Sequence, residues 1–318
     1  MPGLFITSFD CEGKWGVADL LAPVHHRTLS DERIRNAYEA IVRLLADLSV
    51  PATFAVTELF LKSRDELIAL PKEEIRERLP YSGPAFDDLE RGSGEGWSAP
   101  WLPDLIGRIH EQACHGVTHT PWTAMTREQA RYELSLAREA AGRTFIHPRN
   151  AVAHLDLIEE AGFAGYRLPP PKRSRAISMA SEFNPFARAE QSPPCAPLQP
   201  IPGGYFINWL SGARRIVPKA MTRLRARRVL QDAARNGRVA HFWTHPENIA
   251  AAPATLGNLA AVLEEAVSLR RQGLIEVVTQ IDYCRSVEGS TGLGRSKGAD
   301  RDRTDVSPGS LAQFNASA

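Results

Sequence analysis

Apolar and polar residues follow two different periods along the chain, which predict strands and helices in turn. Residues 4–6 begin a short apolar run that fits a strand of about residues 3–9. Ser30 then caps a predicted helix whose apolar residues recur at helical spacing over 34–48, and a β-type run follows at 51–57. Strand, helix and strand make a β-α-β unit, which implies parallel pairing and a right-handed crossover.

Later segments repeat this alternation. Further strands are expected near 112–116, 143–147, 165–167, 238–243 and 275–279, with helices between most of them. An α/β fold therefore follows, with six to seven parallel strands in a barrel or incomplete barrel. Two stretches lack periodicity: 80–101 is predicted to be a surface loop, and the proline-rich stretch 168–204 an excursion over the active face.

Composition limits the class of protein without naming it. The 318 residues are 43% hydrophobic and 24% charged, as in ordinary globular proteins. A net charge of +1 gives no reason to expect a nucleic-acid partner, and an arginine-rich helix near 218–235 is interpreted as a solvated face. The four cysteines are scattered, and no transmembrane-length apolar run or signal peptide is visible, so a cytoplasmic location is expected. Residues 1–286 are predicted to form the catalytic domain and 287–318 a disordered tail.

Two short segments carry candidate metal chemistry. His115 and His119 are four residues apart, and Asp10 and Glu12 follow the first predicted strand on one of its faces. Two imidazoles and one carboxylate make a three-ligand site that leaves coordination positions open, and the second carboxylate is then free to act as a base. Two acids at a buried strand end repel each other, and a cation relieves that repulsion.

The spacing of the two histidines requires a change of backbone conformation between them. Side chains four residues apart in a strand lie roughly 13 Å apart, at about 3.3 Å per residue, and cannot bind one ion. In a helical turn they are neighbours at roughly 6 Å. We therefore expect the segment to curl by His119, which Gly116, Thr118 and Pro121 permit. Because Gly116 stands where zinc proteases have Glu, the protease helix motif does not apply.

Polar side chains follow four of the predicted strands. In β/α barrels, catalytic groups gather at the carboxyl ends of the strands. The residues placed at such ends are Asp10, Glu12, His115, Arg149 and His245. Their convergence on one rim would be a stronger signal than any single motif. His241 lies four residues before His245 in the same strand, so we expect it to lie outside the site.

The order of these motifs resembles that of the polysaccharide deacetylases, carbohydrate esterase family four, which carry the NodB-homology domain. Residues 9–13 look like the first motif of that family, and His115 to His119 looks like its His-x-x-x-His motif. Residues 51–54 are similar to the strand between those motifs, and 244–246 to the late motif with the catalytic histidine. The resemblance extends over about residues 3–280.

This resemblance implies a distorted (β/α) barrel and a metal-dependent hydrolase that removes an acetyl group from an N-acetylated sugar in polysaccharide or glycoconjugate biosynthesis. It implies one divalent ion, zinc, held by Glu12, His115 and His119. Asp10 would be the general base and His245 the general acid.

Three departures from the family pattern stand out. The second acid is Glu12 rather than Asp. Pro148 precedes Arg149 where the family has Arg before Pro, which leaves Arg149 as the candidate to orient Asp10. The Asp-Trp motif that supports the acid histidine has no clear match, and Asn208 with Trp209 is a poor candidate.

Aromatic residues near the predicted strand ends are candidates to stack on sugar faces: Trp15, Trp122, Tyr205 and Trp243. Three alternatives stay open. A non-sugar amide is one possible substrate. The missing support for His245 suits a catalytically silent glycan-binding domain. Two histidines and a carboxylate also form the facial triad of non-haem iron oxygenases.

Overall fold

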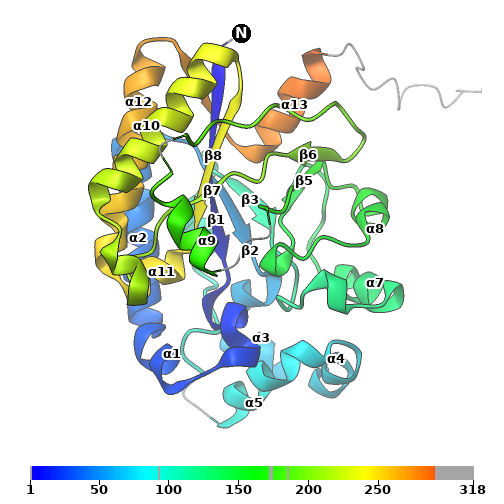
Figure 1. Cartoon of the computed structure of the whole chain (residues 1–318). Helices are drawn as coiled ribbons and strands as arrows, with labels where there is room; N and C mark the ends of the chain where they lie inside the picture. Colours follow the sequence, from blue (N-terminus) through cyan, green and yellow to red (C-terminus); the bar gives the residue numbers. More distant parts are fainter. Residues whose placement is uncertain (1, 92–93, 172–174, 185, 291–318) are drawn as a thin grey trace, which may run out of the picture.

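A curled sheet of parallel strands organises the chain, as Figure 1 shows for a computed structural model that describes residues 2–91, 94–171, 175–184 and 186–290. Its strands are β1 (Gly3–Cys11), β2 (Thr53–Val56), β3 (Glu111–Cys114), β4 (Thr144–Phe145), β5 (Gly165–Arg167), β6 (Gln199–Ile201), β7 (Tyr205–Phe206), β8 (Val239–Thr244) and β9 (Ile275–Val278). The order across the sheet is β6-β5-β4-β3-β2-β1-β8-β7, and β9 pairs with β1. Every ladder is parallel.

Helices connect and cover these strands. They are α1 (Pro23–Thr28), α2 (Asp31–Asp47), α3 (Arg64–Ala69), α4 (Lys72–Arg78), α5 (Gly83–Arg91), α6 (Leu102–Ile106), α7 (Arg127–Ser135), α8 (Leu155–Glu160), α9 (Arg175–Ser181), α10 (Lys219–Asn236), α11 (Pro246–Ala251), α12 (Leu256–Arg271) and α13 (Gln280–Ser290). Short 3-10 turns include η1 (Gly13–Leu20), η4 (Trp122–Ala124), η5 (Pro148–Asn150) and η6 (Gly212–Ile216). Figure 1 shows α2, α10, α11 and α12 on one side of the sheet and α7 and α8 on the other.

The predicted distorted (β/α) barrel is confirmed, but the predicted number of strands is too low. The described residues contain nine strands rather than six or seven. The two additional strands are β6 and β7, which have three and two residues. Strands this short carry no readable alternation, and their proline-rich surroundings concealed them.

A glycine turn carries the chain between the two ends of the curled sheet. β6 and β7 are joined by residues 202–204, and no ladder links these two strands in the part of the chain that the structure describes. A Cβ on Gly204, whose φ is +71°, would lie 2.4 Å from the carbonyl oxygen of His241. A Cβ on Gly203 would lie 2.7 Å from that of Leu168. The turn can therefore pass close to Leu168 and to β8 only because residues 203 and 204 have no side chains.

Strand alternation divides β1 into an outer apolar face and an inner face that changes along its length. Phe5 and Phe9 belong to the main core with the surrounding helices. Ile6 faces the other way and packs with Ile201 and Tyr283, so α13 closes the barrel interior at the amino ends of the strands. Further along the inner face come Ser8, Asp10 and then Glu12. The interior thus changes from apolar to polar toward the carboxyl ends.

Both stretches predicted as irregular contain regular structure, which corrects those predictions. The 80–101 stretch includes α5, and its Phe86 and Trp97 are fully buried. The 168–204 stretch includes α9 and β6. Gly, Pro and charged residues hid these elements, because tertiary packing overrides weak local propensity. Of the predicted tail, 287–290 belong to α13, and the remainder lies outside the described residues.

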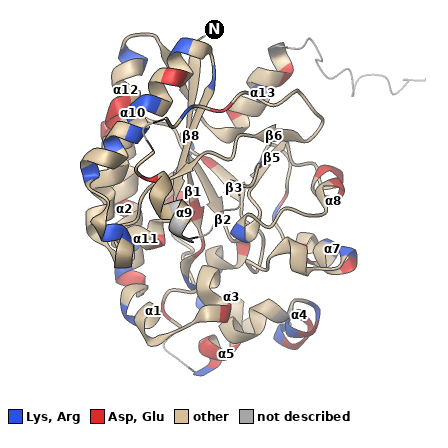
Figure 2. Ribbon diagram, viewed as in Figure 1, with Lys and Arg blue, Asp and Glu red and all other residues tan. Residues whose placement is uncertain are grey.

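The basic helix predicted near 218–235 is α10, and much of its charge is paired. Figure 2 marks Lys and Arg positions in blue along α10 and acidic positions in red on α12 beside it. Arg223 bonds to Glu264 and Glu265, and Arg227 bonds to Glu265. Within the described segments, no helix is long and apolar enough to cross a membrane.

Candidate active site

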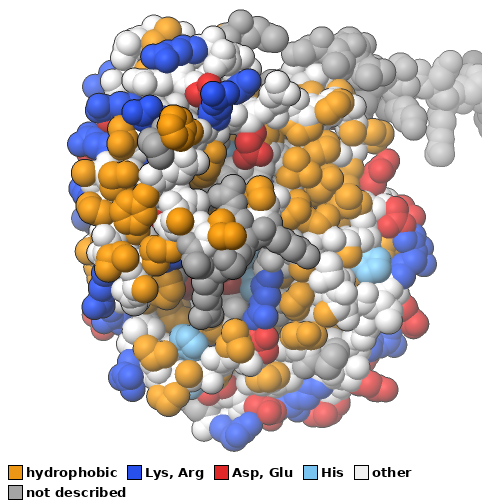
Figure 3. Space-filling view, in the orientation of Figure 1, with side chains coloured by type: hydrophobic (Ala, Val, Ile, Leu, Met, Phe, Trp, Pro, Cys, Tyr) orange, Lys and Arg blue, Asp and Glu red, His pale blue; other side chains and the backbone are white. Residues whose placement is uncertain are grey.

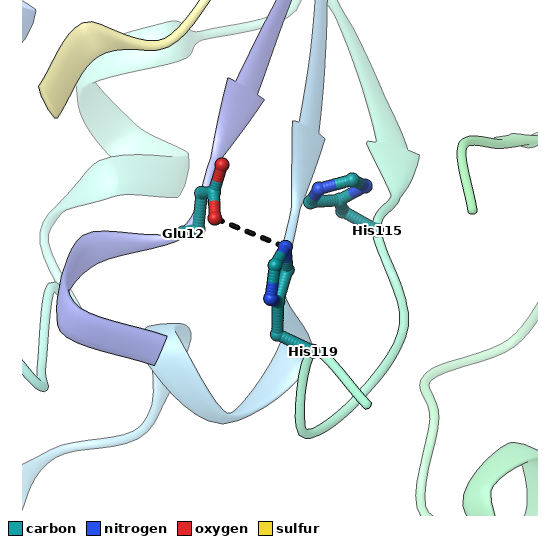
Figure 4. Close-up of side chains that lie close together, drawn as sticks. All are labelled: Glu12, His115 and His119. Carbon is teal, nitrogen blue, oxygen red and sulfur yellow. Dashed lines mark ion pairs between the residues drawn. The ribbon is translucent and has the colours of Figure 1, made fainter. Parts of the chain in front are cut away.

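Three side chains from two neighbouring turns point toward one another at the carboxyl end of the sheet (Figure 4). Glu12 follows β1, and both His115 and His119 follow β3. One ligand atom from each lies within 4.8 Å of the other two, and all three residues are buried. The Oε2 atom of Glu12 is 3.0 Å from Nε2 of His119. The structure therefore brings together the three residues expected to bind the metal.

The expected curl between the two histidines is found. Gly116 has a φ of +73° and His119 a φ of +60°, so the backbone turns back twice after β3. The imidazole centroids of His115 and His119 are consequently 5.0 Å apart. A non-glycine residue pays a steric cost for a left-handed conformation, which is a form of strain found at functional sites.

Hydrogen bonding prepares His115 as a ligand. Its Nδ1 lies 2.8 Å from the carbonyl oxygen of Ile146, which can only accept, so Nδ1 carries the proton and Nε2 keeps its lone pair. Burial lowers the pKa of His115 to about 4, so the ring is neutral at pH 7. A neutral imidazole fixed through its other nitrogen is the form that binds zinc-like ions. Together with a carboxylate and a second imidazole, the donor set fits a divalent ion.

Glu12 also contacts the late histidine of the sequence. Nε2 of His245 is 2.7 Å from Oε1 of Glu12 and 4.0 Å from Oδ2 of Asp10. Burial opposes the charge on His245, but Glu12 outweighs it and raises its pKa to about 9. Burial likewise opposes the charge on Glu12, and His119 and His245 hold its pKa well below the ordinary value. Asn248 lies 3.3 Å from Nδ1 of His245 and is its neighbour on that side.

Asp10 is fixed by an arginine that sequence reasoning missed. Both side chains are almost completely buried, and Arg167 donates to both carboxylate oxygens, over 2.7 and 2.6 Å. Burial alone would raise the pKa of Asp10, but Arg167 outweighs it and lowers the pKa below the ordinary value. Asn150 accepts a further hydrogen bond from Arg167, and the guanidinium lies 4.4 Å from the ring centroid of Trp243.

The contact expected between Arg149 and Asp10 is replaced by another. Arg149 pairs with Asp19 of η1 at the surface, and a third of its side chain is exposed. The φ of Arg149 is +55° and that of Asn150 is +53°. Because the backbone turns at these two residues, the side chain of Asn150 reaches Arg167 and that of Arg149 does not. The sequence signal for Arg167 was its place as a polar residue at the end of a predicted strand. The resemblance to a family motif instead favoured Arg149 as the partner of Asp10.

His241 lies one layer below the site, as its position in the strand predicted. Its Nδ1 lies 2.6 Å from the carbonyl oxygen of Pro202 and must donate to it, so Nε2 accepts from the hydroxyl of Ser8 at 2.9 Å. Burial lowers the pKa of His241 to about 3, which keeps it neutral. Ser8 Oγ also lies 3.4 Å from Arg167. His241 therefore supports the inner face beneath Asp10.

A second missed residue holds the backbone of the first motif. Oε1 of Glu247 accepts from the amide of Gly13 at 2.7 Å and from Tyr38 at 3.0 Å, and the amide of Glu12 is 3.3 Å away. Burial and the charge of Glu12 raise the pKa of Glu247 to about 7. The position directly after His245 and Pro246 was the only sequence signal for it.

Two of the four aromatic residues expected to contact sugars are core residues, which corrects those predictions. Trp15 is 1% exposed, packs edge-on against Trp97 and donates to its carbonyl oxygen. Trp122 is fully buried and packs on Phe145. Strand-end position alone could not distinguish an inward-facing ring from one that faces the cleft.

The other two aromatic residues line a cavity of about 460 Å³ beside the site. Its walls are Pro170, Pro171, Ser181, Glu182, Glu190, Gly204, Tyr205, Phe206, Arg214, Arg225 and Trp243. The rings of Phe206 and Trp243 lie 5.9 and 5.7 Å from the ring of His245, so two walls of the cavity pack beside that histidine. Figure 3 shows hydrophobic side chains on both sides of the central part of this face.

A solved structure with a similar arrangement of strands and helices supports the fold described above. A chain from Mycobacterium smegmatis designated a polysaccharide deacetylase matches with a TM-score of 0.54 and 16% identity, over 91% of each chain. A family 4 carbohydrate esterase from Bacillus anthracis matches at 14% identity over 90% of this chain and 84% of its own, with a TM-score of 0.39. A CE4 family pseudoenzyme from the same organism matches at 14% identity over 89% and 66%, with a TM-score of 0.37. The last two similarities are too loose to support an argument.

The polysaccharide deacetylase fold suggested by the sequence motifs is thus the fold of this chain. At such low identity the similarity extends to the fold alone. No protein-family model and no curated protein matches the sequence. The case for a function therefore rests on the chemistry of the site.

Proposed function

We propose that this protein is a metal-dependent deacetylase that hydrolyses the N-acetyl group of a sugar within a glycan. The observation that carries the proposal is the convergence of Glu12, His115 and His119 with Asp10 and His245 at one end of the barrel. A three-ligand centre with a fixed carboxylate and a protonated imidazole beside it suits amide hydrolysis.

Glu12, His115 and His119 would hold the ion, which we propose to be zinc. When bound, such an ion lowers the pKa of a coordinated water toward about 7 and polarises a carbonyl oxygen. His115 favours this role because its bond to Ile146 leaves one nitrogen lone pair directed into the site. The buried carboxylate of Glu12 supplies the negative charge.

Asp10 and His245 have the protonation states that a base and an acid need. Arg167 keeps Asp10 ionised and fixes its orientation, while each carboxylate oxygen retains a lone pair to accept a proton from water. His245 is protonated at neutral pH because its pKa is about 9, and it donates to the nitrogen of the leaving amine. These opposite states favour hydrolysis over simple binding.

The cavity beside His245 supports a glycan as substrate. Tyr205 and the mostly buried Trp243 contribute aromatic atoms to its walls, and Glu182 and Arg214, which pair with each other, contribute polar atoms. A volume of about 460 Å³ is within the usual range for ligand sites, roughly 300–1,000 Å³. We therefore assign the sugar contacts to Tyr205 and Trp243.

The test is acetate release from N-acetylated glycan oligomers by chelator-treated protein, with and without added Zn²⁺. Release that depends on Zn²⁺ and is lost in Asp10→Asn supports the proposal. Glycan binding without acetate release at full Zn²⁺ occupancy would identify a silent glycan-binding domain instead. Zn²⁺-dependent release from simple amides but not from glycans would identify a non-sugar amide hydrolase.

A further inference from the structure

Glu133 of α7 is a fully buried carboxylate directed at the segment between the two candidate histidine ligands. Its Oε1 accepts from the amides of Val117 at 2.7 Å and Thr118 at 3.2 Å. Its Oε2 accepts from the hydroxyl of Thr118 at 2.9 Å. Burying a carboxylate is costly unless such bonds compensate. All three bonds go to the loop that carries His115 and His119.

The loop is built around this carboxylate. A Cβ on Gly116 would lie 3.1 Å from Oε1 of Glu133 and 2.8 Å from Pro148, so only glycine fits there without a shift of its neighbours. Gly116 and His119 both have positive φ. The loop amides between them point inward and would be unsatisfied without an acceptor. Glu133 thus stabilises a strained backbone conformation that the loop would not keep without these hydrogen bonds.

We propose that Glu133 is a positioning residue of the metal centre, which holds His115 and His119 in the geometry that one divalent ion requires. The inference rests on the proposed function, because it takes the two histidines to be ligands. Glu133 touches neither imidazole through a hydrogen bond; it acts through Val117 and Thr118. Partners that hydrogen-bond a metal ligand directly typically contribute 10–100-fold in metal affinity, and we expect an effect of this order from Glu133.

The chain offers a matched control at the opposite end of the sheet. Glu111 is also buried, and it accepts from Thr53, from the amide and hydroxyl of Thr144, and from the amide of Ile281. Thr53, Glu111 and Thr144 are the first residues of their strands. Removing either carboxylate leaves buried donors unpaired, but only Glu133 is bonded to the ligand loop.

The experiment measures Co²⁺ and Zn²⁺ affinity of the full chain by competition with a chelator, together with urea unfolding and the visible spectrum of bound Co²⁺. Glu133→Ala should bind either ion 10–100-fold more weakly than the wild type and change the Co²⁺ spectrum. Glu133→Gln keeps an oxygen for the two amides and should recover most of the affinity. Glu111→Ala should lower stability and leave affinity and spectrum unchanged.

Equal affinity of the wild type and Glu133→Ala, or an equal loss in Glu111→Ala, would overturn the inference and leave the proposed function standing. A wild-type chain that binds neither ion would overturn both. If the alanine variants fail to fold, Thr118→Val decides the matter. It removes one bond to Glu133 and should weaken binding several-fold, whereas Thr144→Val, which removes a bond to Glu111, should not.

Discussion

Replacement of Arg167 by Met should destabilise the protein much more than the same change at Arg149. Arg167 and Asp10 form a bidentate pair with almost no exposed surface. Loss of one partner of a buried pair leaves an uncompensated charge and costs about 3–5 kcal/mol. Arg149 and Asp19 form a partly exposed pair, for which about 0.2–1 kcal/mol is usual. At pH 7 the two variants should therefore differ by roughly 3 kcal/mol.

The difference in unfolding free energy between the wild type and Arg167→Met should also depend on pH, and the direction of this dependence follows from the titration of Asp10. In the wild type its pKa is lowered, so its stabilising contribution is present above the unfolded value of about 3.9 and is lost as pH falls through the folded value. Arg167→Met removes the largest opposing interaction and leaves only the weaker ones of His115 and His245, so the pKa of Asp10 rises and protonation relieves the buried charge. The stability gap between wild type and variant should consequently narrow from pH 7 toward pH 4.

Urea unfolding of the wild type and both variants across this pH range measures the effect. Adding Asp10→Asn to Arg167→Met removes the orphaned charge and should recover part of the loss, as a double-mutant cycle would reveal. The reasoning would be refuted if Arg149→Met proved as costly as Arg167→Met, or if the gap stayed constant with pH.

Three further predictions follow from the proposed chemistry. His115→Ala should lose stoichiometric divalent metal but keep its circular dichroism spectrum, and unchanged metal content by elemental analysis would remove His115 from the site. Asp10→Asn should retain the metal and lose turnover by about 10²–10⁴-fold, so normal acetate release would exclude Asp10 as the base. His245→Ala should lose turnover and the fall in kcat/KM that marks deprotonation of the acid at alkaline pH, whereas His241→Ala should affect stability alone. An inactive His241→Ala beside an active His245→Ala would show that the acid is misassigned.

The support for the site could not be found from sequence. Arg149 follows β4 and Arg167 ends β5, so position along the chain does not show which of the two reaches Asp10. Which of them does so depends on the left-handed backbone at Arg149 and Asn150 and on the position of β5 in the sheet. Glu133 gave no signal at all, because an acid in a helix is ordinary until its burial is known.

The sequence by itself determined seven of the nine strands that the structure describes, the barrel class and the candidate ligands at the strand ends, because side-chain periodicity and spacing along the chain are local properties. Only the tertiary structure decided which side chains meet. It buried Trp15 in the core, left Trp243 beside the cavity and paired Asp10 with Arg167, which lies 157 residues later. Such contacts depend on strand register and on the path of the loops, which one segment of sequence does not contain.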